Sequence, residues 1–132
     1  MYKILLASDG SKHSFKAAEE AYKLASPLQA KITVIAVVQQ MSGLPLEINK
    51  TLEDNTLEVL EKNKDFFDKK GVEIETLLEH GDPGNIICEV ADEGGYDLII
   101  IGSSGLGSIE GLFLGSVSNK VVHSAKTPVM IV

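Results

Sequence analysis

Apolar residues gather in five short segments along the chain. Two of these segments, residues 2–8 and 32–38, are continuous apolar runs rich in branched side chains, a pattern typical of strands covered on both faces. Shorter runs over residues 72–78, 96–102 and 128–132 predict three further strands. The pattern therefore predicts a sheet of five strands.

Between the apolar runs, hydrophobic positions follow helical spacing. The predicted helices cover residues 11–27, 52 to about 70, where Gly71 stops the helix, 82–94 and about 115–124. Ser11 can cap the first helix, whose predicted inward face includes Phe15, Ala18, Tyr22 and Ala25. One face of the second helix carries Leu52, Thr56, Val59, Leu60, Asn63 and Phe67. A single long loop, residues 39–49, precedes this second helix.

Strands and helices thus alternate from one end of the chain to the other. No repeat, low-complexity segment or long linker divides the sequence, so residues 1–132 are predicted to form one domain. Because strand–helix–strand crossovers are right-handed, this order predicts an open, mostly parallel sheet with helices on both faces. In such folds ligands bind outside the carboxyl ends of the strands, where the strand order reverses.

Composition and charge narrow the classes of partner. The formal net charge is −7 and no cluster of basic residues offsets it, which argues against a nucleic-acid partner. No apolar run reaches the length of a membrane span, so we expect a cytosolic protein with no membrane partner. Cys88 is the single cysteine and is predicted to lie in the core, while the three histidines have no zinc-site spacing.

A glycine- and serine-rich segment, residues 102–118, follows the fourth predicted strand. Glycines let the backbone approach a ligand closely, and the N-terminus of the helix that follows leaves N–H groups free. The N–H groups of residues 102–105 and 115–118, with nearby serine hydroxyls, could therefore form a cradle for an anion such as a phosphate. The segment lacks the P-loop and G-x-G-x-x-G patterns, so glycine content alone fits a plain surface loop equally well.

Several candidate residues have a structural alternative. Asp9, at the end of the first strand, could contact a ligand or simply form a turn or helix cap. Ser116 and Ser118 could bind phosphate, cap the fourth helix, or do both. His13 is predicted to be a solvated surface residue. His80 and His123 lack the partners of a hydrolytic triad and are predicted to be structural.

The spacing of the glycines resembles the pattern of a known family. The chain has Gly102-x-x-Gly105, nine residues, then Gly115-Ser116, together with S-D-G-S after the first strand and T-P-V-M-I-V at the end. Over essentially its whole length it resembles the ATP-binding branch of the universal stress protein family. The resemblance implies a Rossmann-like fold, similar to that of adenine nucleotide alpha hydrolases, with strand order 3-2-1-4-5.

The resemblance also assigns a nucleotide site. It implies that phosphates and ribose contact one wall, made of Ile101, Gly102, Ser104, Gly105, Gly115, Ser116, Val117 and Ser118. The nucleoside and its metal-bound phosphates meet Ala7, Ser8 and Asp9, and the backbone of Val37 recognises adenine. Two positions depart from the family pattern, since Ser104 is often His in relatives and Ala7 is often Pro.

Function follows from the same resemblance. It implies an ATP-binding stress regulator that uses Mg²⁺ or Mn²⁺, held through the phosphates and by Asp9. An alternative is a slow ATPase or self-phosphorylating protein, for which the loop offers only Glu110 and no Lys or Arg. A second alternative is a dimeric scaffold without nucleotide.

The last predicted strand implies how the chain assembles. An apolar strand at the edge of a sheet is a hazard unless something pairs with it. Family members pair their last strands in an antiparallel manner, so the resemblance implies a homodimer through Val129, Met130, Ile131 and Val132. The alternative is an edge covered by its own chain.

Overall fold

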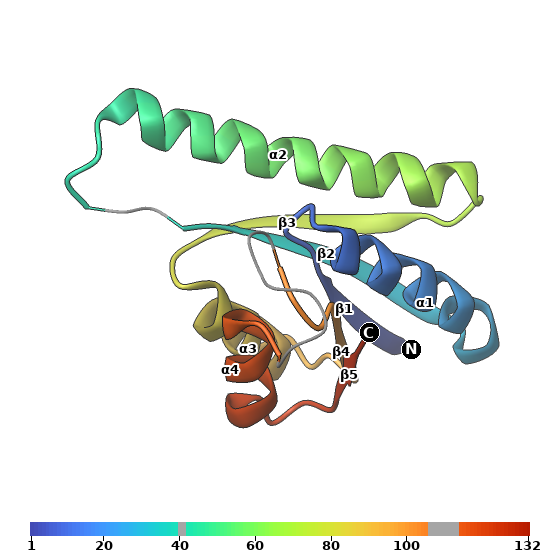
Figure 1. Ribbon diagram of the computed structural model, residues 1–132. Coiled ribbons are helices and arrows are strands. Elements are labelled where there is room, and N and C mark those ends of the chain that lie inside the picture. The colour runs from blue at the N-terminus through green and yellow to red at the C-terminus, as the bar shows by residue number, and fades with distance from the viewer. Residues whose placement is uncertain (40–41, 106–113) are drawn as a thin grey trace.

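In the described part of the chain, five parallel strands alternate with four helices (Figure 1). The computed structural model describes residues 1–39, 42–105 and 114–132. The strands are β1 (Tyr2–Ala7), β2 (Ala30–Val38), β3 (Ile74–His80), β4 (Leu98–Ile101) and β5 (Val129–Ile131). The helices are α1 (Lys12–Leu28), α2 (Leu46–Lys69), α3 (Pro83–Glu93) and α4 (Ser116–Ser124). The sheet has the order β3-β2-β1-β4-β5, so the predicted fold class and strand order are confirmed.

The central strands are buried on both faces, which explains their continuous apolar sequence. In β1, Ile4, Leu5 and Leu6 are fully buried. Alternate residues of β1 pack into two separate apolar cores on opposite faces of the sheet. Ile4 and Leu6 belong to one core, and Leu5 belongs to the other. Helices α1 and α2 cover the first face, and α3 and α4 cover the second (Figure 1).

Helix α1 packs on the sheet through small residues. Ala17, Ala18 and Ala21 are fully buried, whereas Tyr22 is 37% exposed. The prediction that Tyr22 faces the sheet is therefore wrong. Alanines let the helix approach the strands closely, and the aromatic ring instead lies at the helix flank under the ammonium group of Lys70, 5.4 Å from it.

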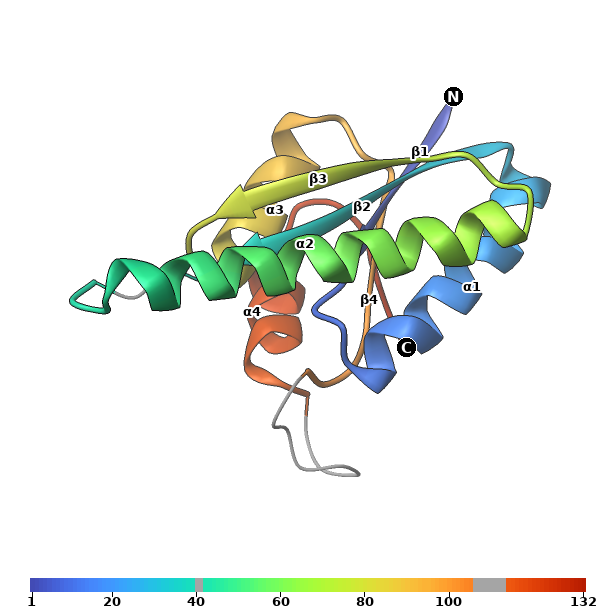
Figure 2. The same ribbon diagram turned by 90° about the horizontal axis from the view of Figure 1, so that it is seen from above.

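Helix α2 begins at Leu46, inside the segment predicted to be a long loop. Its first turns project past the ends of β2 and β3 (Figure 2). Leu46 is 85% exposed and Ile48 is 46% exposed, so this part of the helix has no buried apolar stripe. Hydrophobic periodicity could not mark it for that reason. The predicted inward face from Leu52 to Phe67 is buried or half-buried, with Leu60, Asn63 and Phe67 innermost.

The other predicted elements agree with the structure. The Asp82 side chain caps α3 by accepting from the backbone N–H of Asn85 at 3.2 Å, and Pro83 is the first helical residue. Cys88 is buried in α3, and burial raises the pKa of its thiol. None of the helices in the described ranges has the length and apolar character that a bilayer crossing requires.

Asp92, near the end of α3, holds the chain where it enters β5. One carboxylate oxygen accepts a hydrogen bond from the Thr127 hydroxyl at 2.7 Å and from the Thr127 N–H at 3.1 Å. The N–H of Lys126 is 3.3 Å from the same oxygen. The Thr127 hydroxyl and these backbone donors lower the pKa of Asp92 below that of an ordinary aspartate.

This arrangement predicts a pH-dependent contribution to stability. Because the pKa of Asp92 is lowered by folding, its contribution is complete above the unfolded-state pKa and is lost as the pH falls through the folded-state pKa. We expect Asp92→Ala to lower the free energy of unfolding by about 1–2 kcal/mol at neutral pH. In thermal melts, the gap between wild type and Asp92→Ala should close in acid. A gap that stays constant down to strongly acidic pH would contradict this assignment.

Candidate binding site

A cavity of about 470 Å³ lies at the carboxyl ends of the strands. Every residue that the sequence predicted for the site lines it: Ala7, Ser8, Asp9, Val37, Ile101, Gly102, Ser104, Gly105, Gly115, Ser116, Val117 and Ser118. Side chains from α2 and α3 complete the walls. The residues predicted from the sequence therefore all lie around one cavity.

The pairing of β1 with β4 brings the two halves of the site together. Ala7 at the end of β1 is the register partner of Ile101 at the end of β4. From β1 the chain crosses to β2 on one side, and from β4 it crosses to β5 on the other. The cavity therefore lies at the point where the strand order reverses, which is the usual ligand site of open parallel sheets.

Two glycines after β4 are required by close packing. A Cβ atom on Gly102 would lie 2.8 Å from the backbone carbonyl carbon of His13 in α1. A Cβ atom on Gly105 would overlap the carboxylate of Asp9. Because these glycines have no Cβ atom, the segment after β4 packs directly against the start of α1 and against Asp9. This packing does not depend on a ligand.

Part of the predicted cradle of N–H groups is used within the protein. The N–H of Ser103 donates to the carbonyl of Val132 at 2.7 Å, and the N–H of Gly115 donates to the carbonyl of Ser103 at 2.7 Å. The Ser118 hydroxyl donates to the carbonyl of Ser103 as well, at 2.8 Å. The prediction that all these groups point at a ligand is wrong for the two amides and for this hydroxyl, because they bond to carbonyls of the protein itself.

The N–H groups in the first turn of α4 are not used in hydrogen bonds within the described parts of the chain. Gly115 is the N-cap residue, and no side-chain hydrogen bond caps the helix among the residues described. The N–H groups of Ser116, Val117 and Ser118 have no acceptor in the described parts of the chain, and all three residues line the cavity. A helix N-terminus with free N–H groups carries partial positive charge, so this wall favours an anion.

Asp9 combines both roles that its sequence position allowed. Its Oδ1 accepts from the N–H of Ser11 at 2.9 Å, which forms the turn into α1. The same side chain lines the cavity and lies against Gly105. The turn therefore fixes a carboxylate at the mouth of the site.

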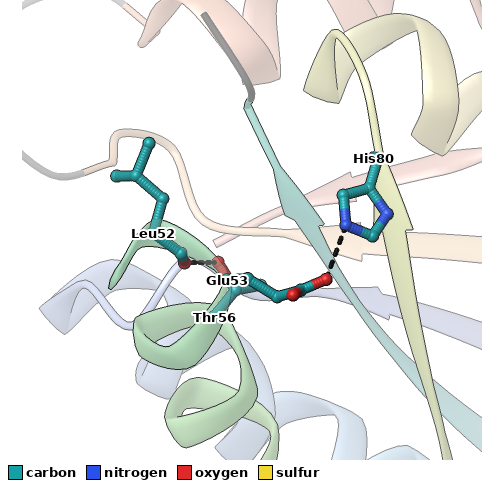
Figure 3. A network of polar contacts seen from close by, with 4 residues as sticks. All are labelled: Leu52, Glu53, Thr56 and His80. Atoms are coloured by element: carbon teal, nitrogen blue, oxygen red, sulfur yellow. Dashed lines mark hydrogen bonds and ion pairs between the residues drawn. The ribbon is translucent and has the colours of Figure 1, made fainter. Parts of the chain in front are cut away.

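Helix α2 supplies a wall that sequence reasoning missed. Leu52, Asn55, Thr56 and Val59 line the cavity from this helix. Glu53 fixes the helix over the sheet, because its Oε1 lies 2.8 Å from Nε2 of His80 at the end of β3 (Figure 3). The Thr56 hydroxyl bonds back to the carbonyl of Leu52 at 2.8 Å, also shown in Figure 3. Helical spacing had assigned part of this face to the core, and the overhang of α2 beyond the strands turns it into a cavity wall instead.

His13 differs from the prediction of a solvated residue. It is half-buried, its Nδ1 lies 3.4 Å from the Ser103 hydroxyl, and its Nε2 is buried with no partner among the described residues. Close packing of Gly102 on the His13 backbone explains why the side chain is not free in solvent. His80 and His123 make the structural contacts expected of them, to Glu53 and to the carbonyl of Asn119.

Comparison with known proteins now gives the family. The sequence matches the universal stress protein family over residues 1–132. This chain belongs to that family. A universal stress protein of Methanocaldococcus jannaschii is 36% identical, with 98% of this chain and 81% of the relative covered. One of Bacillus subtilis is 34% identical, with 98% and 97% covered. A solved universal stress protein in complex with cAMP is 28% identical, covers 99% of this chain and 96% of its own, and has a TM-score of 0.77.

In this universal stress protein the cavity carries little charge. Asp9 is the one charged side chain among the described lining residues. No group of three His, Cys, Asp or Glu side chains that could hold a metal ion occurs in residues 1–39, 42–105 and 114–132. Glu110, which the sequence offered for catalysis, lies outside the described residues.

The packing of Gly102 makes a stability prediction. We expect Gly102→Ala to lower the free energy of unfolding by about 1–3 kcal/mol, because the added methyl group meets rigid backbone. Gly84→Ala is the matched control, since the atom nearest to a Cβ there is the Cδ of Lys120, in the outer part of a side chain that can move. Denaturant unfolding of both variants measures the difference. Equal midpoints for Gly102→Ala and wild type would show that the packing at this position is not tight.

Proposed function

We propose that this universal stress protein binds ATP in the cavity and acts as a nucleotide-dependent stress regulator rather than an efficient enzyme. The observation that carries the proposal is the row of N–H groups at Ser116, Val117 and Ser118, which have no acceptor among the described residues and belong to residues that line the cavity. Such groups bind phosphate without needing basic side chains. The cAMP complex of a related family member supports the choice of an adenine nucleotide.

The rest of the cavity suits a nucleoside. Its volume of about 470 Å³ lies in the range of ordinary small-molecule sites. Apolar side chains from three elements, Val37, Leu52 and Ile101, line it and could enclose a planar base. We place the base against the end of β2, where the Val37 backbone can hydrogen-bond it, and the phosphates at α4.

A divalent cation fits this arrangement only with help from the nucleotide. Asp9 offers one carboxylate, and hard oxygen ligands of this kind suit Mg²⁺ or Mn²⁺. Because no cluster of metal-binding side chains occurs in the described ranges, phosphate oxygens and water would supply the other ligands. When bound, the cation would offset phosphate charge beside Asp9.

Efficient phosphoryl transfer has less support. It requires a group that positions the attacking nucleophile and a cation near the transferred phosphoryl group. The described lining residues offer Asp9 and neutral groups only. We therefore rank a slow ATPase or self-phosphorylating protein below a binding protein, and we rank a scaffold without nucleotide below both because it leaves the free N–H groups unused.

A single backbone donor tests the proposal. Ser116→Pro removes one N–H of the α4 terminus, and the preceding Gly115 already has the extended backbone (φ −64, ψ 167) that a following proline requires. We expect Ser116→Pro to weaken ATP binding about tenfold or more in isothermal titration calorimetry.

Ser116→Ala is the matched control, because it removes the hydroxyl and keeps the N–H. It should bind ATP within about threefold of wild type. Wild-type affinity in Ser116→Pro would refute the role of the amides. Absence of saturable heat with ATP, AMP and cAMP on the wild-type protein would refute nucleotide binding altogether.

We further propose that the regulator is a homodimer paired through β5. This strand lies at the edge of the sheet, and Val129, Met130, Ile131 and Val132 are only half-buried in the single chain. The carbonyl of Pro128 and the N–H of Val132 bond to β4, so the backbone groups of Val129 and Ile131 point outward. These outward groups could pair with a second copy of the strand.

The dimer makes its own prediction. Ile131→Pro removes an outward N–H without removing a bond to β4, and edge strands tolerate proline. We expect this variant to have the mass of one chain in size-exclusion chromatography with light scattering, while wild type and Ile131→Val have the mass of two. A two-chain mass for Ile131→Pro would exclude pairing through this edge.

A further inference from the structure

One polar residue lies deep in the core between α2 and the sheet. Asn63 is fully buried in α2, on the same face as Leu60 and Phe67, which belong to the apolar core. Its Oδ1 has no hydrogen-bond partner among the described residues. A buried acceptor without a partner is costly, so an apolar residue would suit this position better if packing were its only role.

The Asn63 amide can have only one orientation. Its Nδ2 lies 2.9 Å from the carbonyl of Val59 and 3.1 Å from the Ser8 hydroxyl. A carbonyl can only accept, so the atom beside Val59 must be the amide nitrogen rather than its oxygen. The nitrogen can only donate, and therefore Ser8 receives a hydrogen bond from Asn63.

This donation sets the direction of a chain of hydrogen bonds. The Ser14 hydroxyl donates to the carbonyl of Ser11 at 2.7 Å, so the Ser14 proton is committed. The Ser8 hydroxyl lies 3.2 Å from the Ser14 hydroxyl and must be the donor of that pair. The chain therefore runs one way, from Asn63 through Ser8 and Ser14 to the backbone of Ser11.

Ser8 and Ser14 also line the cavity. Each hydroxyl has one proton and two lone pairs, and the chain uses the proton and one lone pair of each. What remains for a ligand on this side is a lone pair, which can accept a hydrogen bond but cannot donate one.

We propose that Asn63 is a positioning residue that holds the Ser8 hydroxyl as an acceptor, beside a Ser14 hydroxyl whose proton is already committed to Ser11, so that this wall of the cavity selects a hydrogen-bond donor on the bound nucleotide. The proposal rests on nucleotide binding at this cavity. The opposite wall, at Ser116 to Ser118, offers donors. The two walls therefore have opposite polarity, and a ligand with an anionic end and a donor group fits in one orientation.

The donor can come from the sugar hydroxyls or from the amino group of the base, and three ATP analogues separate these sources. Inosine triphosphate replaces the amino group with a carbonyl oxygen. The 2′-fluoro-2′-deoxy and 3′-fluoro-3′-deoxy analogues replace one hydroxyl each with an acceptor. We expect wild type to bind one of the three about tenfold or more weakly than ATP, because an acceptor then faces the Ser8 lone pair.

Two variants release the Ser8 proton. In Asn63→Leu the amide no longer holds the Ser8 hydroxyl, and in Ser14→Ala the acceptor of its proton is gone. In both, the hydroxyl can turn and donate to the analogue, so we expect the penalty for that analogue to fall to about threefold or less. Ser14→Ala alters a small side chain and gives the answer even if Asn63→Leu folds poorly.

Phe67→Leu is the matched control. It changes the same buried face of α2 but has no polar link to the cavity, so it should lower the melting temperature and leave the analogue ratios unchanged. If ATP binds and all three ratios are the same in wild type, Asn63→Leu and Ser14→Ala, the role of Asn63 is refuted while the proposed function stands. If wild type does not bind ATP, both fail.

Discussion

The parallel pairing of β1 with β4 is the interaction on which the site depends. Because Ala7 and Ile101 are register partners, the turn after β1 and the glycine segment after β4 leave the sheet side by side. Gly102 and Gly105 then allow these two segments to touch, against His13 and Asp9. A shift of register would part them, and the cavity would lose one of its walls.

Neutral dipoles explain how an acidic chain could hold a polyphosphate. With a net charge of −7, the protein repels anions at long range. The start of α4 offers N–H groups whose partial charge acts only at short range, where a phosphate has already entered. Affinity built in this way depends on geometry more than on charge, so the packing that places α4 matters as much as the residues that touch the ligand.

Sequence patterns predicted the parts of this structure that local chemistry determines. The strands, their order and the inward face of α2 from Leu52 onward followed from hydrophobic spacing and from the family resemblance. The start of α2 did not, because Leu46 is exposed and gives no periodic signal. The use of the Ser103 and Gly115 amides within the protein could not be predicted either, since their partners are set by tertiary contacts between distant segments.

Ser103 joins three parts of the molecule through its backbone. Its N–H reaches Val132 at the chain end, and its carbonyl receives both the N–H of Gly115 and the hydroxyl of Ser118. The start of α4 and the edge strand β5 thus both bond to the backbone of this one residue. Any effect of occupancy at the helix terminus on association at that edge, carried through Ser103, must by reciprocity be matched by an equal effect in return.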